Sequence, residues 1–388
     1  MEAHEKVSLV HDEATLRAMV LALEAVPRVA IDTEFHAEHR YRPELMLVQI
    51  AAPTGEVWVI DPRAFDIRAL ATVLERQEIV VHGGQQDIEL LYRSTGALPP
   101  RLFDTQRAAA LVGMGYPTRL GTVVHRTLGE VLNKAASLTD WSTRPLTARQ
   151  LQYAAEDARV LLPLAAGLEA LLEPLGRAAW AWEASQELCA EVHRPPPELD
   201  AWLQWEIAAS LDEPERQAMR ALFVWRDATA RHADQPPRQI LSDALALDLA
   251  RRRPASIADL GENRRVPQGL IKRHGAPILA TLKRAEHETE PAPAPPSTEA
   301  ALLANLIEHW AALVDRERGL ARNLVMPRSL ATRVATEGHE ALSGWRAAAL
   351  GEDLRALLEG RHCIGVRGQI SAILDQSGAP AALGKDFA

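Results

Sequence analysis

The sequence predicts an α/β domain, in which helices flank a mixed sheet, followed by two all-α helical domains. Near the N-terminus, three short β-prone runs succeed one another and then give way to alternating helical and strand-like segments. Such a meander followed by alternation is typical of helices packed on a mixed sheet. In the second half, apolar residues recur at helical spacing on both sides of one proline-rich stretch, which indicates two helical modules.

The composition is that of a soluble globular protein. The chain has 388 residues, of which 47% are hydrophobic, so it can bury a sizeable core and form two or three domains. No apolar run approaches the roughly 20 residues of a membrane-spanning helix, and the N-terminus lacks the basic start and apolar core of a signal peptide. We therefore expect a cytoplasmic protein with no membrane partner.

Cysteine usage excludes two classes of site. The chain has two cysteines, Cys189 and Cys363, which lie far apart and have no partner at metal-ligand spacing. Neither a disulfide framework nor a zinc cluster is therefore supported. We expect both thiols to be buried or half-buried.

Charge is distributed unevenly along the chain. The formal net charge is −9 at pH 7, and residues 1–200 carry all of it, with 19 Lys and Arg against 28 Asp and Glu. Residues 211–287 differ, because they hold 14 basic and 10 acidic side chains. This later segment therefore offers the most favourable charge for contact with a nucleic acid.

Local patterns predict each element of the first half. After a first strand, Leu16, Val20 and Leu23 recur at helical spacing, and residues 53–55 (Pro-Thr-Gly) form a hairpin-type turn between two apolar runs. The predicted strands are residues 29–35, 45–51, 57–60 and 78–82, and the predicted helices are residues 67–76, 86–94 and 147–162.

Two carboxylates end the strand predicted at residues 29–35. Asp32 and Glu34 follow a short apolar run, and residues i and i+2 of a strand project to the same face. Considered alone, this pair is most simply an exposed strand end with two solvated acids, because short motifs often arise by chance. If the two acids are not solvated, they need a cation.

Two further acidic features also have simple explanations when each is considered alone. Asp87 lies in the first turn of the helix after Gly83 and Gly84, where an acid complements the helix dipole. Tyr153 and Asp157 are spaced i and i+4 on one helical face, as in a surface pair. Together, the three features supply four carboxylates and a phenol. Phosphodiester hydrolysis with two divalent ions needs such a set, because carboxylates from different elements hold the ions.

The three motifs resemble those of a known exonuclease superfamily. Residues 31–35 (Ile-Asp-Thr-Glu-Phe), 81–87 (Val-His-Gly-Gly-Gln-Gln-Asp) and 153–157 (Tyr-Ala-Ala-Glu-Asp) are similar to the motifs of the DEDD superfamily, tyrosine subclass. Within it, residues 103–106 (Phe-Asp-Thr-Gln) and 139–147 (Thr-Asp-Trp-Ser-Thr-Arg-Pro-Leu-Thr) resemble the ribonuclease D family.

This resemblance covers about residues 5–175 and implies a ribonuclease H-like fold and a 3′-to-5′ exoribonuclease. Such an enzyme trims single-stranded RNA 3′ ends, including those of tRNA precursors, and releases nucleoside 5′-monophosphates. The resemblance implies two divalent cations, and oxygen-only ligation favours Mg²⁺ or Mn²⁺. The implied metal ligands are Asp32, Glu34, Asp87 and Asp157. Asp32 would bridge the two ions, and Asp87 would reach its ion through a water molecule. Tyr153 would orient the attacking water, since a phenol with a pKa near 10 is a poor base at neutral pH.

Other residues are candidates for substrate contacts. Phe35 could stack on the terminal base and His36 could contact the terminal nucleotide, but a core-facing Phe35 and a surface His36 are equally open. Lys134 occupies the place of a family lysine that can approach the substrate, although its surroundings are less polar than in the family. For Asp104 and Asp140 we expect capping or turn roles rather than metal ligation.

The second half resembles an accessory module of the same enzymes. Residues 225–227 (Trp-Arg-Asp), 235–238 (Gln-Pro-Pro-Arg) and 250–254 (Ala-Arg-Arg-Arg-Pro) are similar to the HRDC domain, a helical module shared by RecQ helicases and ribonuclease D. Its basic side chains, including Arg251 and Arg252, could contact phosphates or could form a solvated charged face.

The sequence therefore predicts four segments and leaves alternatives for function. The segments are an exonuclease domain over residues 1–195, an HRDC domain over 205–288, a Pro/Ala linker over 289–298 and a second HRDC-like domain over 299–388. In the last segment we expect helices to residue 375, with Leu302, Leu303, Leu306 and Trp310 on one face, and then a loose tail. We expect a monomer. A DNA exonuclease of the same superfamily is an alternative, since no motif reads the 2′-hydroxyl, and an inactive RNA-binding scaffold is another.

Overall fold

The chain divides into two compact units. The structure is a computed structural model that describes residues 6–38, 40–132, 140–193, 201–204, 206–367, 370–375 and 381. The first unit comprises Met1–Phe35, Leu45–His193 and Thr298–Ala388, and the second comprises His36–Glu44 and Arg194–Ser297. Among the described residues, no helix is both long and apolar enough to cross a membrane.

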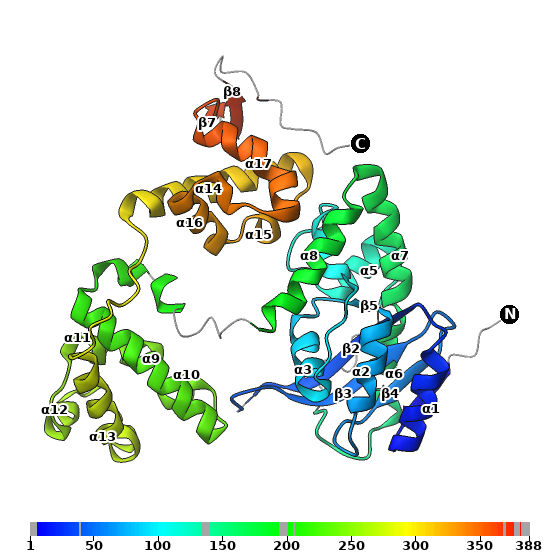
Figure 1. Cartoon of the computed structure of the whole chain (residues 1–388), viewed down its shortest axis with the longest axis horizontal. Coiled ribbons are helices and arrows are strands. Elements are labelled where there is room, and N and C mark those ends of the chain that lie inside the picture. Colours follow the sequence, from blue (N-terminus) through cyan, green and yellow to red (C-terminus); the bar gives the residue numbers. More distant parts are fainter. Residues whose placement is uncertain are drawn as a thin grey trace. The chain divides into compact units, whose positions relative to one another are not determined.

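A six-stranded mixed sheet organises the first unit (Figure 1). The strands are β1 (Val7–Val10), β2 (Arg28–His36), β3 (Glu44–Ala51), β4 (Val57–Ile60), β5 (Glu78–Val81) and β6 (Leu102–Asp104). Their order is β1-β4-β3-β2-β5-β6, in which β3 and β4 are antiparallel while β2, β5 and β6 are parallel. The predicted mixed sheet with flanking helices is confirmed, and β2, which carries the first acidic motif, lies inside the sheet.

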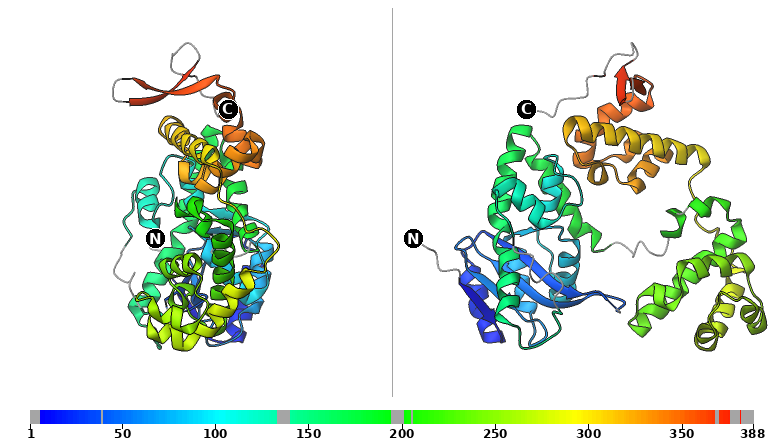
Figure 2. Two further views of the ribbon diagram at one scale, coloured as in Figure 1. Left: turned by 90° about the vertical axis from the view of Figure 1, so that its left-hand side faces the viewer. Right: turned by 180° about the vertical axis from the view of Figure 1, so that it is seen from behind.

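Helices cover both faces of this sheet. One buried cluster joins the sheet to α1 (Glu13–Leu23), α2 (Ala71–Arg76) and α3 (Gln85–Thr95). Another joins the opposite face to α4 (Thr105–Ala110), α5 (Leu120–Leu128), α7 (Leu161–Leu172) and α8 (Ala178–Glu191). The rear view in Figure 2 shows α7 crossing the sheet on that opposite face. α6 (Ala148–Arg159) packs Ala154 against Leu47 and Val59 of the sheet.

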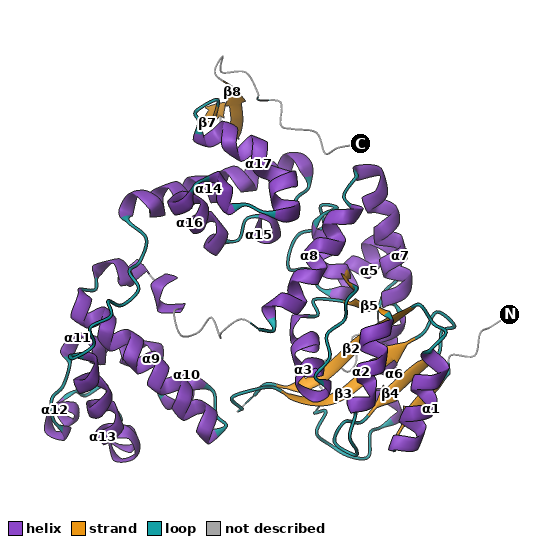
Figure 3. Cartoon of the chain, viewed as in Figure 1, coloured by secondary structure: helices purple, strands orange, loops and turns teal. Residues whose placement is uncertain are grey.

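The C-terminal part of the first unit is not entirely helical, which corrects the prediction of helices to residue 375. Its helices are α14 (Thr298–Arg318), α15 (Arg322–Val325), α16 (Arg328–Glu337) and α17 (Gly344–Leu358). They are followed by an antiparallel pair, β7 (His362–Arg367) and β8 (Ile370–Asp375), which Figure 3 shows in orange. The β-branched residues Ile364, Val366, Ile370 and Ile373 in these two segments favour strands over a helix.

This C-terminal part shares a buried core with the sheet domain. The Ala321 N–H donates to the Ala110 carbonyl at 3.1 Å, and the Trp345 indole N–H donates to Glu187 of α8 at 3.0 Å. Trp310 is fully buried, as expected of a core residue, whereas Leu302 and Leu306 are exposed by 64% and 44%. The two cysteines, Cys189 and Cys363, differ in exposure.

Cys189 is buried, as expected, but Cys363 in β7 is exposed, which corrects the prediction for that thiol. An edge strand of a two-stranded sheet has no layer to cover its outer face, so side chains there remain open to solvent. The segment expected to be a loose tail, from residue 376 onward, lies outside the described residues apart from residue 381.

The second unit is built from helices wherever residues 201–297 are described (Figure 3). The helices are α9 (Glu213–Ala233), α10 (Pro237–Ile240), α11 (Asp243–Arg252), α12 (Ile257–Glu262) and α13 (Gln268–Ala285), preceded by short 3-10 turns at Ala201–Gln204 and Glu206–Ser210. Asp212 starts α9 through a capping box with Glu215. A buried cluster that includes Met219, Leu222 and Leu249 fills the centre.

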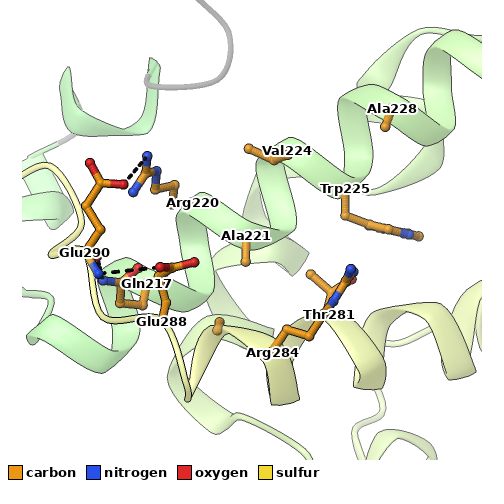
Figure 4. Close-up of a pocket in the computed structure, with 11 residues that line it drawn as sticks. Gln217, Arg220, Ala221, Val224, Trp225, Ala228, Thr281, Arg284, Glu288 and Glu290 are labelled. Carbon is orange, nitrogen blue, oxygen red and sulfur yellow. Dashed lines mark hydrogen bonds and ion pairs between the residues drawn. The ribbon is translucent and has the colours of Figure 1, made fainter.

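The start of the proline-rich linker is tied to α9. The Gln217 side-chain amide donates to the Glu290 carbonyl at 2.6 Å, and the Ala292 N–H donates to Glu213 at 2.8 Å. Beside these contacts, a hollow of about 450 Å³ opens between α9, α13 and the linker (Figure 4). Arg220, Arg284, Glu288 and Glu290 line it together with Trp225 and small apolar residues.

Candidate active site

Strand β2 carries the first two acids of the site. Val29, Ala30 and Ile31 are fully buried between β3 and β5, so an apolar, β-prone run anchors the strand in the sheet. Asp32 and Glu34 follow this run and are both half-buried. The alternation of a strand places these two carboxylates on one face, as the sequence predicts.

Asp87 lies on α3, the helix that follows β5, and β5 is the strand next to β2 in the sheet. β5 ends at Val81, the chain turns at Gly83 and Gly84, and α3 begins at Gln85. Asp87 therefore lies in the first turn of α3, and it is buried, with 8% of its surface exposed. The Thr33 hydroxyl donates a hydrogen bond to its carboxylate.

Helix α6 supplies the third acidic feature. Thr147 caps its start through a capping box with Gln150. Besides Gln150, its buried residues are the alanines Ala154, Ala155 and Ala158, whose small side chains allow the helix to approach the sheet closely. Tyr153 and Asp157 are half-buried one turn apart, and the Tyr153 hydroxyl donates a hydrogen bond to the Asp157 carboxylate.

The electrostatics show that these carboxylates lie close together. Burial and three neighbouring carboxylates raise the pKa of Asp32 well above its usual value. Those neighbours are, in order of effect, Asp87, Glu34 and Asp157. Burial, followed by the charges of Asp157 and Asp87, raises the pKa of Glu34 to about 8. We call Asp32, Glu34, Asp87 and Asp157 the carboxylate cluster.

Hydrogen bonds partly offset burial at the other two acids. Burial raises the pKa of Asp87 to about 6, against the opposing effect of the Thr33 hydroxyl. Burial likewise raises the pKa of Asp157 to about 6, against the opposing hydrogen bond from Tyr153. The pKa of Tyr153 is itself raised by burial and by the charge of Asp157, so this phenol stays protonated at neutral pH.

The donor set of the carboxylate cluster fits a hard divalent cation. All its ligand atoms are oxygens, and a cation would relieve the repulsion that raises these pKa values. Among the described residues, however, no three His, Cys, Asp or Glu side chains are arranged so that they could hold a metal ion as they stand.

The residues predicted to contact the substrate lie in different parts of the chain. Phe35 is half-buried and packs against the apolar cluster beneath α1 and α3, in agreement with the core-facing alternative. His36 ends β2 and is half-buried. Lys134 lies outside the described residues. Arg251 and Arg252 are exposed at the C-terminal end of α11 in the second unit.

The capping and turn roles predicted for two other acids are confirmed. Asp104 caps α4 by accepting the N–H groups of Gln106 and Arg107, and Asp140 accepts the Ser142 N–H in an exposed turn. Thr33 is a partner of Asp87 that was not predicted, because a hydroxyl between two acids was its only signal in the sequence.

Comparison with known proteins identifies the family of this chain. Residues 7–173 match a protein family described as 3′-5′ exonuclease, and residues 215–282 match the HRDC domain. Ribonuclease D from Granulibacter bethesdensis is 31% identical over 387 residues, which cover 93% of this chain and 95% of the relative. Ribonuclease D from Gluconacetobacter diazotrophicus is 32% identical over 374 residues, which cover 91% and 93%.

A solved structure is similar over nearly the same length. The crystal structure of Escherichia coli RNase D, described as an exoribonuclease involved in structured RNA processing, has a TM-score of 0.80 with 26% sequence identity. The similarity covers 92% of this chain and 99% of that one. The chain therefore belongs to the ribonuclease D family of 3′-5′ exoribonucleases.

Proposed function

We propose that this protein hydrolyses RNA from the 3′ end and releases nucleoside 5′-monophosphates with the help of two divalent cations. The observation that carries the proposal is the carboxylate cluster, in which the pKa of Asp32 is raised by the charges of acids from α3 and α6. Four buried carboxylates repel one another unless a positive charge lies among them. Membership of the exonuclease family supports the use of divalent cations. Mg²⁺ and Mn²⁺ are the cations that suit oxygen ligands.

Each residue of the site has a part in this proposal. Asp32, Glu34, Asp87 and Asp157 would hold the cations, which would supply a water of lowered pKa and stabilise the leaving oxygen. Tyr153 would orient the attacking water as a hydrogen-bond donor, because its raised pKa keeps the phenol protonated.

The choice of RNA over DNA is tested with matched oligonucleotides. A 5′-labelled RNA strand and the 5′-labelled DNA strand of the same sequence would be incubated with the protein and Mg²⁺ or Mn²⁺. We expect the RNA to be shortened from its 3′ end with release of 5′-monophosphates. Faster degradation of the DNA strand would favour the alternative of a DNA exonuclease.

The assignment of the site is tested with Asp32→Asn. This change removes one charge from the carboxylate cluster, and we expect hydrolysis to fall at least about 100-fold while RNA binding persists. Asp66→Asn, an exposed acid paired with Arg68, serves as the control. Unchanged hydrolysis by Asp32→Asn would contradict the site, and an inactive parent that still binds RNA would support the scaffold alternative.

We also propose that the HRDC region contacts RNA through Arg251 and Arg252. Both side chains are exposed, although Arg251 donates to Ser210 at 3.1 Å and Arg252 pairs with Asp248 at 3.2 Å. If they bind phosphates, replacing both with Glu should reduce the slope of log K against log salt by about 1 for each contact. Arg17→Glu, at an exposed ion pair on α1, is the control.

The physiological setting belongs to the same proposal. We propose that the enzyme acts as a monomer in the cytoplasm on single-stranded 3′ ends, with tRNA precursors as the substrate class. Sequencing RNA 3′ ends in cells with and without the gene tests this, since longer tRNA 3′ ends are expected in its absence. His36 and Lys134 stay candidates for contacts with the terminal nucleotide, whereas the packing of Phe35 against the apolar cluster favours a core role.

A further inference from the structure

We propose that Asp104 is a positioning residue, whose carboxylate holds the turn from which α3 begins and thereby places Asp87 in the carboxylate cluster. The inference rests on the proposed function, because it gives Asp104 a part in building the cation site without ligating a cation. Asp104 ends β6 next to β5 in the sheet, and it is fully buried. Its capping role at α4 explains only two of the four hydrogen bonds that its carboxylate accepts.

The Asp104 carboxylate joins the starts of two helices. Its Oδ1 accepts the N–H groups of Gln106 at 2.7 Å and Arg107 at 3.1 Å, which caps α4. The same oxygen accepts the Gly83 N–H at 3.1 Å, and Oδ2 accepts the Gly84 N–H at 2.9 Å. Since Gly83 and Gly84 directly precede α3, one side chain sets where α3 begins relative to α4.

The glycine turn has little freedom to find another position. Gly83 has a φ of +64°, which disfavours other residues, and a Cβ on Gly84 would lie 2.4 Å from the Val81 side chain. The turn therefore packs directly against the end of β5, with both N–H groups aimed at Asp104. Asp87 follows Gly84 by three residues in a rigid helical turn, so a shift of this turn displaces the Asp87 carboxylate.

A hydrogen bond to α8 fixes the backbone of Asp104. Its backbone N–H donates at 2.8 Å to the hydroxyl of Ser185, which is fully buried on that helix. Arg107, whose N–H Asp104 accepts, extends its guanidinium to Glu187 and Glu191 of α8, each at 3.1 Å. The sheet edge, α4 and α8 thus fix the anchor from which the start of α3 is held.

Asp104→Asn tests this role with the full-length protein. The amide keeps the shape of the side chain and, with its carbonyl in the place of Oδ1, still caps α4. Its NH₂ group then faces the Gly84 N–H, so two donors oppose each other and the turn keeps only the hydrogen bond from the Gly83 N–H to the amide oxygen. We expect the dissociation constant for Mn²⁺, measured by paramagnetic resonance of the free ion, to rise about 10- to 100-fold, as for other residues that orient metal ligands.

Hydrogen exchange gives a readout that does not depend on the metal. Peptides that span residues 82–90 should exchange faster in Asp104→Asn than in the parent, while peptides from β3 and β4 should not change. Asp212→Asn is the matched control, because Asp212 caps α9 in the second unit by accepting the Glu215 N–H. An asparagine keeps this cap, so Asp212→Asn should leave the Mn²⁺ affinity unchanged.

The outcomes separate this inference from the proposed function. A parent that binds Mn²⁺, together with an Asp104→Asn variant of equal affinity and equal exchange at residues 82–90, would overturn the positioning role. If Asp212→Asn lost the same Mn²⁺ affinity, the loss in Asp104→Asn would be a general effect of the substitution. That result would also overturn the positioning role of Asp104. A parent that does not bind Mn²⁺ would contradict the proposed cation site, while the exchange measurement would still decide whether Asp104 holds the turn.

A second variant covers the case in which Asp104→Asn does not fold. Gly84→Ala introduces a Cβ that collides with Val81 and displaces the turn without removing any polar group. We expect the same rise in the Mn²⁺ dissociation constant. Parent-like affinity in a folded Gly84→Ala protein would contradict the dependence of Asp87 on this turn.

Discussion

The Thr33 hydroxyl donates a hydrogen bond to the Asp87 carboxylate and so connects β2 to α3 inside the candidate site. Strand alternation directs Thr33 away from the face that carries its neighbours Asp32 and Glu34. The bond favours the ionised form of Asp87, and it opposes the burial that raises this pKa to about 6. One residue of the first motif therefore lowers the pKa of an acid from the second motif, against the larger effect of burial.

Thr33→Val should shift the pH dependence of the enzyme. The change removes the hydroxyl but keeps the branched shape, so Asp87 loses a bond to its ionised form and its pKa should rise further. Protons would then compete with cations at higher pH. In rate measurements on an RNA oligonucleotide with Mn²⁺, we expect the acidic limb of the pH profile to move upward by about one pH unit, the scale of a single hydrogen bond.

Thr33→Ser is the control for this prediction, since it retains the donor hydroxyl. Its acidic limb should coincide with that of the parent. A Thr33→Val profile that also coincides with the parent would show that the hydroxyl has no influence on the ionisation of Asp87.

Tyr153→Phe should slow hydrolysis at every pH. The hydroxyl donates to Asp157, and the pKa of Tyr153 is raised above its usual value, so the phenol acts in its protonated form. Removing a positioning donor, rather than a base, should lower kcat about 10- to 100-fold without changing the shape of the profile between pH 6 and 9. A rise in rate with pH that is present in the parent and lost in Tyr153→Phe would instead identify the phenolate as a general base.

Much of the site followed from the sequence because its acids lie in regular elements with clear local signals. The strand that ends in Asp32 and Glu34 has a buried β-prone run before it, and the helix of Tyr153 and Asp157 starts at a capping Thr147. The spacing of each pair within its element was therefore predictable. Long-range partners were not, since the contact of Thr33 with Asp87 depends on which strand lies beside β2.

The last part of the chain shows where periodicity was insufficient. Leu302 and Leu306 fall on a helical spacing with Trp310, yet they are exposed, because α14 buries only the face toward its own unit. The β7 and β8 pair was missed since two six-residue strands can be mistaken for the continuation of a helical pattern. Which side of such a helix is covered depends on tertiary packing that one sequence does not contain.

Gln49→Met should stabilise the protein. Gln49 lies in β3 opposite Val59 of β4 and is fully buried, and within the described part of the chain neither atom of its amide has a hydrogen-bond partner. An unsatisfied buried amide costs about 1–3 kcal/mol, whereas Met fills a similar volume without polar atoms. We expect thermal unfolding to shift upward by about 2–4 °C for each kcal/mol gained. A lower Tm would reveal a partner for the amide, such as an internal water.

Repulsion within the carboxylate cluster predicts that the cation-free protein loses stability as the pH rises. In the folded protein the pKa of Glu34 is about 8, against 4.5 for the free side chain, and those of Asp87 and Asp157 are about 6, against 3.8. Within this window the folded state keeps protons that the unfolded state has already released. The free energy of unfolding must therefore fall as pH increases from about 4 to about 8.

Thermal unfolding in EDTA at pH 5, 6.5 and 8 measures this effect. We expect Tm to fall along the series, and Mn²⁺ at pH 8 to restore it, because a cation bound only by the folded state adds to its stability. Asp32→Asn removes one of the repelling charges and should flatten the decline, whereas Asp66→Asn, at an exposed pair with Arg68, should not. If Tm stayed constant from pH 5 to 8 in the parent, the four acids would not share a common field, and the cation site would lose its electrostatic basis.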